Sequence, residues 1–316
     1  MVKGGPKADE RTAANEVNCG TVDLAAPPPL RPGSLVAIVA PASPFARDEL
    51  FRGLAWLRTR YALRLSSTIL ERTGYTAGGD ARRASELAAA LTDPDVSAVL
   101  CARGGYGAMR ILDALPWTAF ARRPKWLVGF SDVTALHVAA NSHGVCTLHG
   151  PNVTGLGRSI TASERLALLD ALEGRPPVAW THLEIIHGAG APPARGPLVG
   201  GNLSLLASMA AGGRLALPRG AILALEDVTE RPYRLDRMLT SLLLGGHLSN
   251  LSAIVLGGFT QCDAGPDGVT ALDVLTDRTS GLGIPVVAAA PFGHGAPNRC
   301  FVLGATAVLS GTTLAL

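Results

Sequence analysis

The sequence predicts an α/β protein in two parts: an open parallel sheet covered by helices, then a smaller, β-rich domain of mixed α/β structure. Short apolar runs bounded by Gly and Pro alternate with stretches of helical periodicity, which is typical of a parallel sheet with helices on both faces. The 316 residues suffice for about two domains. Residues 181–196 are rich in Gly, Ala and Pro and lack periodicity, so we expect a linker there.

The first domain is expected over residues 31–180. Its first strand, 34–40 (SLVAIVA), is a short β-branched run that ends at Pro41. Residues 48–61 then place apolar side chains three and four positions apart, as in a helix that packs on a sheet. The further predicted elements are a helix at 80–91 with Asp80 as its cap, a strand at 96–101, a helix near 106–112, a strand at 126–130 and a helix at 132–140.

The second domain is expected over residues 197–316. Apolar strand-like runs dominate it, with fewer helical stretches between them, which indicates mixed α/β structure. The predicted strands are 196–201, 221–226, 254–259, 285–289 and 301–309, and the predicted helices are 234–244 and 271–278.

Composition argues against several classes of function. The formal net charge is only +3 and no block of Lys and Arg is present, so nothing supports a nucleic-acid partner. The five Cys form no C-x-x-C pair, which argues against a zinc site or a disulfide framework and favours reduced thiols in a cytoplasmic protein. Residues 1–30 lack the apolar core of a secretory signal, so we expect a disordered leader. No apolar run reaches the roughly 18 residues needed to cross a membrane.

Ser131 is a candidate nucleophile in the segment WLVGFSDVTALHVAA. A predicted strand ends just before it and a predicted helix begins just after it, so its hydroxyl should lie on a sharp turn near free N–H groups that favour negative charge. The G-x-S-x-G elbow is not satisfied, because Val133 replaces the second glycine. Ser131 or Asp132 could instead simply cap the helix.

The segment CARGGYG, residues 101–107, also follows a predicted strand. Its adjacent glycines allow the backbone to approach a ligand closely, although they could equally form an ordinary turn. No nucleotide-binding pattern of the G-x-G-x-x-G or Walker type fits. Because ligands of parallel sheets bind at the carboxyl ends of the strands, a second donor for an oxyanion could come from this loop.

His294 and Glu226 are the candidates for a base and its orienting acid. Glycines flank His294 on both sides, which leaves its imidazole free to reach across a cleft, but His149 in LHGP has similar neighbours. Glu226 ends an apolar predicted strand, where an unpaired carboxylate would be costly. Its partner could be an Arg or a helix end, or a histidine whose tautomer it fixes.

Taken together, these segments resemble the L,D-carboxypeptidase family of serine peptidases. The resemblance runs in order from about residue 30 to 316, and only 209–220 depart clearly from the family pattern. The segments are LRPGSLVAIVAPASP at 30–44, GDARRASELAAALTDPDVSAVLCARGGYG at 79–107, LVGFSDVTALHVAA at 127–140, LHGPN at 148–152, GPLVGGNLSLLAS at 196–208, LALEDVTERPYRLDRMLTSL at 223–242, IVLGGFTQCD at 254–263 and PFGHGAPNRCFVLGATAVL at 291–309.

The resemblance implies a catalytic triad of Ser131, His294 and Glu226. It further implies an oxyanion hole made by the backbone N–H groups of Asp132 and Gly105. A flavodoxin-like N-terminal domain, an active site between the domains, a homodimer, and no metal or cofactor are also implied. The expected substrate is a muropeptide, a murein tetrapeptide that loses D-alanine during cytoplasmic peptidoglycan recycling, with neither nucleic acid nor membrane as a partner.

Two other interpretations stay open. The same triad would serve a peptidase like the microcin C immunity enzymes, which cleave an aminoacyl-nucleotide amide and would need an aromatic surface for the base. A non-catalytic small-molecule-binding module with this fold is the alternative from another class. Gly104 and Asn202 are weaker candidates for substrate contact, and Asn202 could equally cap a helix that follows a strand.

Overall fold

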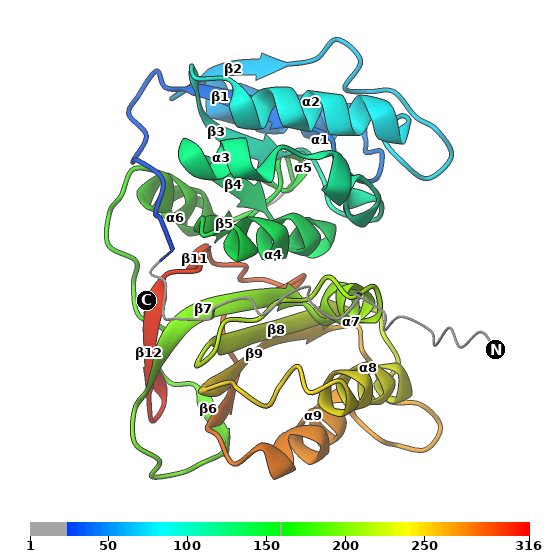
Figure 1. Cartoon of the computed structure of the whole chain (residues 1–316), viewed down its shortest axis with the longest axis vertical. Helices are drawn as coiled ribbons and strands as arrows, with labels where there is room; N and C mark the ends of the chain where they lie inside the picture. The colour runs from blue at the N-terminus through cyan, green and yellow to red at the C-terminus, as the bar shows by residue number, and fades with distance from the viewer. Residues whose placement is uncertain (1–23, 159) are drawn as a thin grey trace, which may run out of the picture.

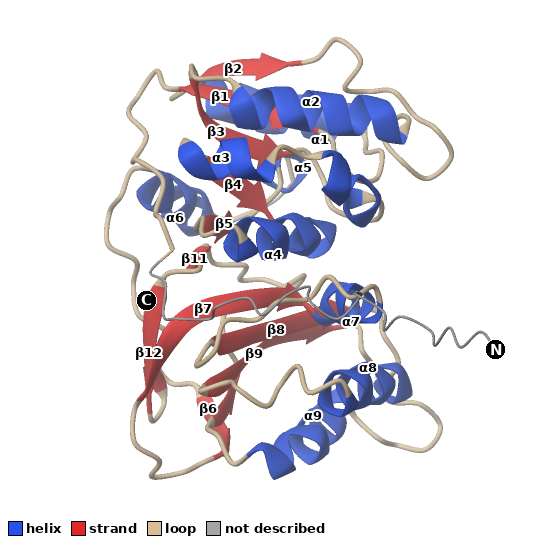
Figure 2. Cartoon of the chain, viewed as in Figure 1, coloured by secondary structure: helices blue, strands red, loops and turns tan. Residues whose placement is uncertain are grey.

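A computed structural model describes residues 24–158 and 160–316, and it contains two α/β halves that are each built on their own sheet (Figure 1). Figure 2 shows the two sheets one above the other, with helices packed against both of them. The predicted fold class is confirmed, because the first sheet is mostly parallel and the second is mixed.

Within the described residues the first sheet has six strands in the order β11-β5-β4-β3-β1-β2. They are β1 (Leu35–Val39), β2 (Ala62–Leu65), β3 (Val96–Cys101), β4 (Trp126–Gly129), β5 (Thr147–His149) and β11 (Phe301–Leu303). The run β2-β1-β3-β4-β5 is parallel throughout and has the flavodoxin-like order, in which ligands bind where the order reverses, between β1 and β3. β11 reaches this sheet from the other end of the chain and runs antiparallel to β5.

Helices cover both faces of this sheet. One face carries α2 (Asp80–Thr92), η1 (Ala108–Ala114), α3 (Trp117–Arg122) and α4 (Thr134–Ser142), and the other carries α1 (Arg47–Arg58), α5 (Val153–Leu156) and α6 (Ala162–Leu172). Val99 and Leu100, neighbours on β3, belong to opposite cores. The strand is therefore apolar along its whole length, as expected of a sheet buried on both sides.

The second sheet has the order β13-β12-β7-β8-β9-β10-β6. Its parallel centre is β7 (Ala194–Asn202), β8 (Ile222–Val228), β9 (Ala253–Thr260) and β10 (Val286–Ala288). The antiparallel edges are β6 (Glu184–His187), β12 (Thr306–Ser310) and β13 (Thr313–Ala315). One face packs on α7 (Leu203–Ala211), α8 (Pro232–Leu244) and α9 (Ala271–Thr279), which η3 (Ser280–Leu282) follows, and aromatic residues such as Trp180 and Phe292 pack on the other.

Three local expectations were wrong. The single strand predicted at 301–309 is broken at Gly304, whose φ of +95° turns the chain between β11 and β12, which belong to different sheets. The chain after β4 forms the short 3-10 turn η2 (Ser131–Val133) before α4 begins. The N-cap of α2 is Gly79, and Asp80 is the first residue of the helix, where its carboxylate pairs with the guanidinium groups of Arg83 and Arg110.

Parts of the predicted leader and linker are ordered. Residues 1–23 lie outside the described residues, but 24–30 pack on the first half. There the Ala25 N–H donates to the Gly144 carbonyl and the Leu30 N–H to the Leu172 carbonyl, each at 2.8 Å. Within 181–196, β6 pairs with β10 at the edge of the second sheet. Composition alone missed these segments because their order comes from pairing with distant parts of the chain.

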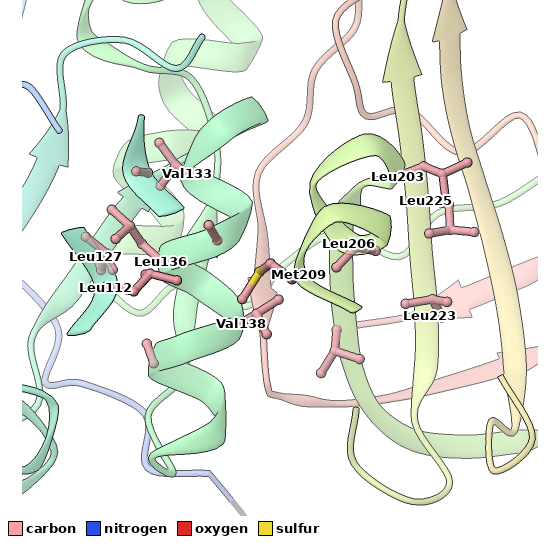
Figure 3. Close-up of a cluster of buried hydrophobic side chains, with 14 of the residues drawn as sticks. Leu112, Leu127, Val133, Leu136, Val138, Leu203, Leu206, Met209, Leu223 and Leu225 are labelled. Carbon is pink, nitrogen blue, oxygen red and sulfur yellow. The ribbon is translucent and has the colours of Figure 1, made fainter. Parts of the chain in front are cut away.

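The two halves share one apolar core. α4 and α7 meet between the sheets, where Met209 of α7 points toward Val138 of α4 (Figure 3). The same core continues into Leu127 of the first sheet and Leu223 of the second. Apolar packing therefore holds the two sheets in a fixed relation, which matters because the site described below takes residues from both.

We expect Met209→Ala to lower the free energy of unfolding by about 2–5 kcal/mol, because Met209 is fully buried where the two halves meet. Leu244→Ala is the matched control, since Leu244 is 85% exposed on α8, and it should change stability by less than about 0.5 kcal/mol. Denaturant unfolding of the three proteins checks this, and equal losses for both variants would contradict a shared core.

Candidate active site

Ser131 lies on a strained turn at the carboxyl end of β4. Its φ of +67° falls in the left-handed region that a non-glycine residue seldom adopts, at a cost of about 1–3 kcal/mol. The N-cap positions of η2 and α4 are Phe130 and Val133, so neither Ser131 nor Asp132 occupies one. The helix-cap interpretation of these two residues is therefore wrong, and Ser131 stays a predicted nucleophile on a sharp turn between a strand and a helix.

The glycine loop at 104–107 lies directly against this turn. A Cβ atom placed on Gly104 would be 2.8 Å from the Ser131 Cβ and 3.0 Å from its Oγ, so only glycine fits there. Gly105 has a φ of +104°, and a Cβ atom there would come even closer to the side chain of Ser43. The Ser43 N–H donates to the Gly104 carbonyl at 3.2 Å, and the Ser43 Oγ accepts the Tyr106 N–H at 3.0 Å. The close backbone approach expected of this loop is thus present, and it is made to the turn that carries Ser131.

His294 and Glu226 form a hydrogen-bonded pair. The imidazole Nδ1 lies 2.6 Å from the Glu226 Oε2, and the carboxylate is fully buried. The other carboxylate oxygen accepts a hydrogen bond from the Asn202 side-chain amide at 3.3 Å. With Nδ1–H directed at the carboxylate, Nε2 is the nitrogen available to take a proton. The His294 side chain keeps 18% of its surface exposed, so the ring can still meet a substrate.

Contacts between the halves bring these residues to one place. Asn202 lies opposite Glu226 in the register of β7 and β8. Its N–H donates to the Thr134 Oγ1 at 3.1 Å, just after the Ser131 turn. On the other side, the imidazole of His294 lies 4.9 Å, centroid to centroid, from the ring of Phe130, the residue before Ser131. These contacts place Ser131, Glu226 and His294 in one region, where the two halves meet.

Asn202 is fixed by the fold around it. Its side-chain oxygen accepts the Leu205 N–H at 3.2 Å, so it caps α7 as the sequence allowed. Its amide also donates to Asp227 at 3.1 Å, and Asp227 in turn accepts the N–H and the hydroxyl of Ser204 at 2.8 Å. The carboxylate of Asp227 was not singled out from the sequence, although it directly follows Glu226.

His149, the rival base, lies in the core. Its ring stacks on Phe301 at 4.6 Å, and burial lowers its pKa to about 3, so it is neutral and closed to solvent. Its Nε2 lies 3.3 Å from the side-chain oxygen of Asn298, which also accepts the Gly293 N–H at 3.2 Å. His149 therefore supports the loop that carries His294. Asn298 was missed, although it stands in the same PFGHGAPN segment.

The loop that carries His294 is also held from the first half. The Asn298 N–H donates to Glu164 Oε1 at 2.9 Å, and Glu164 is the acid of the capping box that opens α6. A carboxylate of one half therefore fixes a loop of the other, close to the imidazole.

Asp132 is buried next to Ser131 in the turn after β4. Its Oδ2 accepts the Ala108 N–H at 2.8 Å, and burial raises the pKa of its carboxyl group to about 6 despite that hydrogen bond and the charge of Arg83. The backbone of Asp132 is a predicted oxyanion donor, whereas its side chain faces the glycine loop.

The described residues contain neither a candidate metal site nor a helix that could cross a membrane. In 24–158 and 160–316, no group of three or more His, Cys, Asp or Glu side chains could hold a metal ion. Among the helices of those same segments, none combines the length and the apolar character that a membrane crossing requires.

The buried carboxyl of Asp132 predicts a particular pH dependence of stability. Its pKa of about 6 lies above the usual 3.8, so the folded state holds the proton more tightly than the unfolded chain and loses stability as the group ionises. Relative to wild type, Asp132→Asn should therefore gain up to about 3 kcal/mol as the pH rises from about 4 to about 7. Urea unfolding at both pH values checks this, with the exposed Asp95→Asn as control. A difference between Asp132→Asn and wild type that does not change with pH would contradict it.

The chain resembles known proteins over most of its length. It matches the LD-carboxypeptidase N-terminal domain over residues 36–150 and the LD-carboxypeptidase C-terminal domain over 195–309. The murein tetrapeptide carboxypeptidase of Pseudomonas aeruginosa is 38% identical over 288 residues, which cover 88% of this chain and 94% of that protein.

Solved structures of similar fold include a muramoyltetrapeptide carboxypeptidase and MccF. The muramoyltetrapeptide carboxypeptidase from Oxalobacter formigenes has a TM-score of 0.78 at 29% identity, covering 89% of this chain and 97% of that one. MccF in complex with glutamyl sulfamoyl guanosine has a TM-score of 0.83 at 20% identity, covering 93% and 98%, which is a likeness of fold alone. The matched domains and the identity to the Pseudomonas protein together show that the chain belongs to the LD-carboxypeptidase family of serine peptidases.

Proposed function

We propose that this protein is a serine carboxypeptidase in which Ser131, His294 and Glu226 form the catalytic triad. The observation that carries the proposal is the hydrogen bond of 2.6 Å between the imidazole and a fully buried carboxylate, beside a strained serine turn. A carboxylate without exposed surface is tolerated only when it is paired, and here its partner is an imidazole that still reaches solvent.

In the proposed reaction, the His294 Nε2 removes the proton of the Ser131 hydroxyl as its oxygen attacks the carbonyl before the terminal residue. The backbone N–H groups of Asp132 and Gly105 stabilise the oxyanion, and one such donor is typically worth about 2.7–4 kcal/mol. The imidazolium, stabilised by Glu226, gives the proton to the leaving amine, and water then releases the acyl group. In support, residues 24–158 and 160–316 offer no hydrogen-bond acceptor for the Gly105 N–H.

The proposed substrate is a murein tetrapeptide, cleaved at its L,D-amide bond with release of D-alanine. Relatives that carry the name murein or muramoyltetrapeptide carboxypeptidase, at 38% and 29% identity, support this substrate class. A role in peptidoglycan recycling would place the protein in the cytoplasm, and we propose a homodimer from the family resemblance.

One observation favours the alternative substrate. Tyr75 and Tyr106 are 63% and 52% exposed, and their rings meet edge to face at 5.4 Å beside the glycine loop. This is the kind of aromatic surface on which a nucleotide base could stack. An aminoacyl-nucleotide amide, as in the microcin C immunity peptidases, is therefore the second candidate substrate.

A substrate panel tests the proposal. Wild type should release D-alanine from an L,D-terminal tetrapeptide, while an all-L tetrapeptide and glutamyl sulfamoyl guanosine should stay intact, as followed by mass spectrometry. Ser131→Ala and His294→Ala should lower kcat by at least about 10⁴-fold, and Glu226→Gln by about 10³–10⁴-fold, with the fold retained. Turnover by folded Ser131→Ala would exclude this nucleophile, and cleavage of the nucleotide conjugate alone would favour the alternative.

The glycine loop gives a second test. Gly104→Ala would place a methyl group 2.8–3.0 Å from the Ser131 side chain, so we expect kcat/KM to fall by about 100-fold or more because the hydroxyl is displaced. Gly79→Ala is the matched control, since a Cβ there meets nothing within 4 Å. Steady-state kinetics on the tetrapeptide compares them, and near-normal turnover by Gly104→Ala would show that the loop does not press on the nucleophile.

A further inference from the structure

We propose that Arg83 and Asp132 grip the two ends of one peptide group, between Gly107 and Ala108, and so hold the glycine loop at 104–107 in position beside Ser131. They would be positioning residues that act on the oxyanion through the loop. The expected effect on catalysis rests on the proposed function. The contacts between these residues and the loop do not depend on the substrate.

The two contacts converge on a single peptide plane. Arg83 Nη1 donates to the Gly107 carbonyl oxygen at 2.9 Å, and the Asp132 Oδ2 accepts the Ala108 N–H at 2.8 Å. A cation thus holds the oxygen and an anion holds the nitrogen of the same amide. Because both contacts are charge-assisted hydrogen bonds, they resist rotation of this plane more strongly than neutral contacts would.

Both charged side chains are buried, which needs a reason. Arg83 and Asp132 are 1% and 2% exposed, and burying a charged group is costly unless its hydrogen bonds repay that cost. Arg83 also donates to the carbonyl of Pro41 and pairs with Asp80. It therefore ties together the two loops that leave β1 and β3, on either side of the point where the strand order reverses.

The remaining contacts fix the other end of the loop. Ser43, two residues after Pro41, holds the Gly104 carbonyl and the Tyr106 N–H, as described above. Gly105 and Gly107 both have positive φ, and a loop of such residues is intrinsically loose unless its peptide groups are held. The contact to the Gly104 carbonyl therefore holds the same peptide group that carries the Gly105 N–H, the proposed oxyanion donor, and the other contacts hold two peptide groups that follow it.

Four variants and a control test the clamp. Arg83→Met and Asp132→Ala each remove one grip, and Arg83→Met/Asp132→Ala removes both. Asp132→Asn keeps an acceptor oxygen for the Ala108 N–H. The control is Arg82→Met, one residue away on α2, whose guanidinium bonds the Ala77 carbonyl and Glu86 but not the loop.

The first measurement is amide hydrogen exchange, which needs no substrate. Exchange of the Ala108 amide and of the loop should accelerate about tenfold or more in Arg83→Met and in Asp132→Ala, and stay unchanged in Arg82→Met. Loop exchange equal to wild type in both single variants would overturn the clamp, whatever the enzyme cleaves.

The second measurement is the rate at which a fluorophosphonate labels Ser131, compared with kcat on the tetrapeptide. Both should fall about 10- to 100-fold in each single variant with KM changed less than about threefold, because the donors act on the transition state. The double variant should be no slower than the worse single one, and Asp132→Asn should recover most of the rate.

The outcomes separate the clamp from the proposed function. Faster loop exchange with undiminished labelling of Ser131 would overturn the positioning role, as would effects of the two single variants that simply multiply. If wild type labels at Ser131 but leaves the tetrapeptide intact, the substrate proposal fails while labelling and exchange still decide the clamp.

Discussion

The buried carboxylate of Glu226 is the constraint on which the rest of the site depends. It lies in β8, inside the second half, with no exposed surface, where a carboxylate without hydrogen-bond donors would be costly. His294 and Asn202 supply those donors, and each is tied to something else. Asn202 reaches Thr134 in the first half, and the imidazole lies against Phe130, so the two donors of this carboxylate also contact the residues around the Ser131 turn.

Each half brings something that the other lacks. The first half supplies a strained serine and a loop of glycines at the reversal of strand order, where backbone N–H groups can meet a ligand. The second supplies the acid and the imidazole. The core shared by α4 and α7, together with β11 in the first sheet, keeps the halves in register, and the contact from Glu164 to Asn298 fixes the histidine loop across the boundary.

Many of the strands and the residues that follow them could be predicted from the sequence, because the residues that end a strand are its neighbours in the chain. The strand at 96–101 was placed correctly, since its apolar run ends in a glycine-rich turn, and the carboxyl ends of parallel strands pointed to Ser131 and to the glycine loop. The likeness to a known family then selected His294 and Glu226. Local sequence could not choose between His294 and His149, because burial in an aromatic cluster decides that question.

The sequence could not predict contacts between parts of the chain that are distant in sequence. Three contacts join residues far apart in the sequence. They are the pairing of β11 with β5 in the first sheet, the hydrogen bonds of Arg83 and Asp132 to one peptide group, and the hydrogen bond from Asn298 to Glu164. Asp80 looked like a cap because of its place at the start of a helix, yet its carboxylate pairs with Arg83 of the same helix and with Arg110, which the fold brings near. Such contacts follow from tertiary packing and leave no local pattern.

The proposed triad requires the imidazole of His294 to interact with both Glu226 and Ser131. Proton NMR of the Nδ1–H of His294 measures this, because a proton held between an imidazole and a buried carboxylate resonates far downfield. We predict such a resonance in wild type, its loss in Glu226→Gln, and a shift when a phosphonate is attached to the hydroxyl of Ser131. A resonance that is absent from wild type, or indifferent to modification of Ser131, would contradict the account.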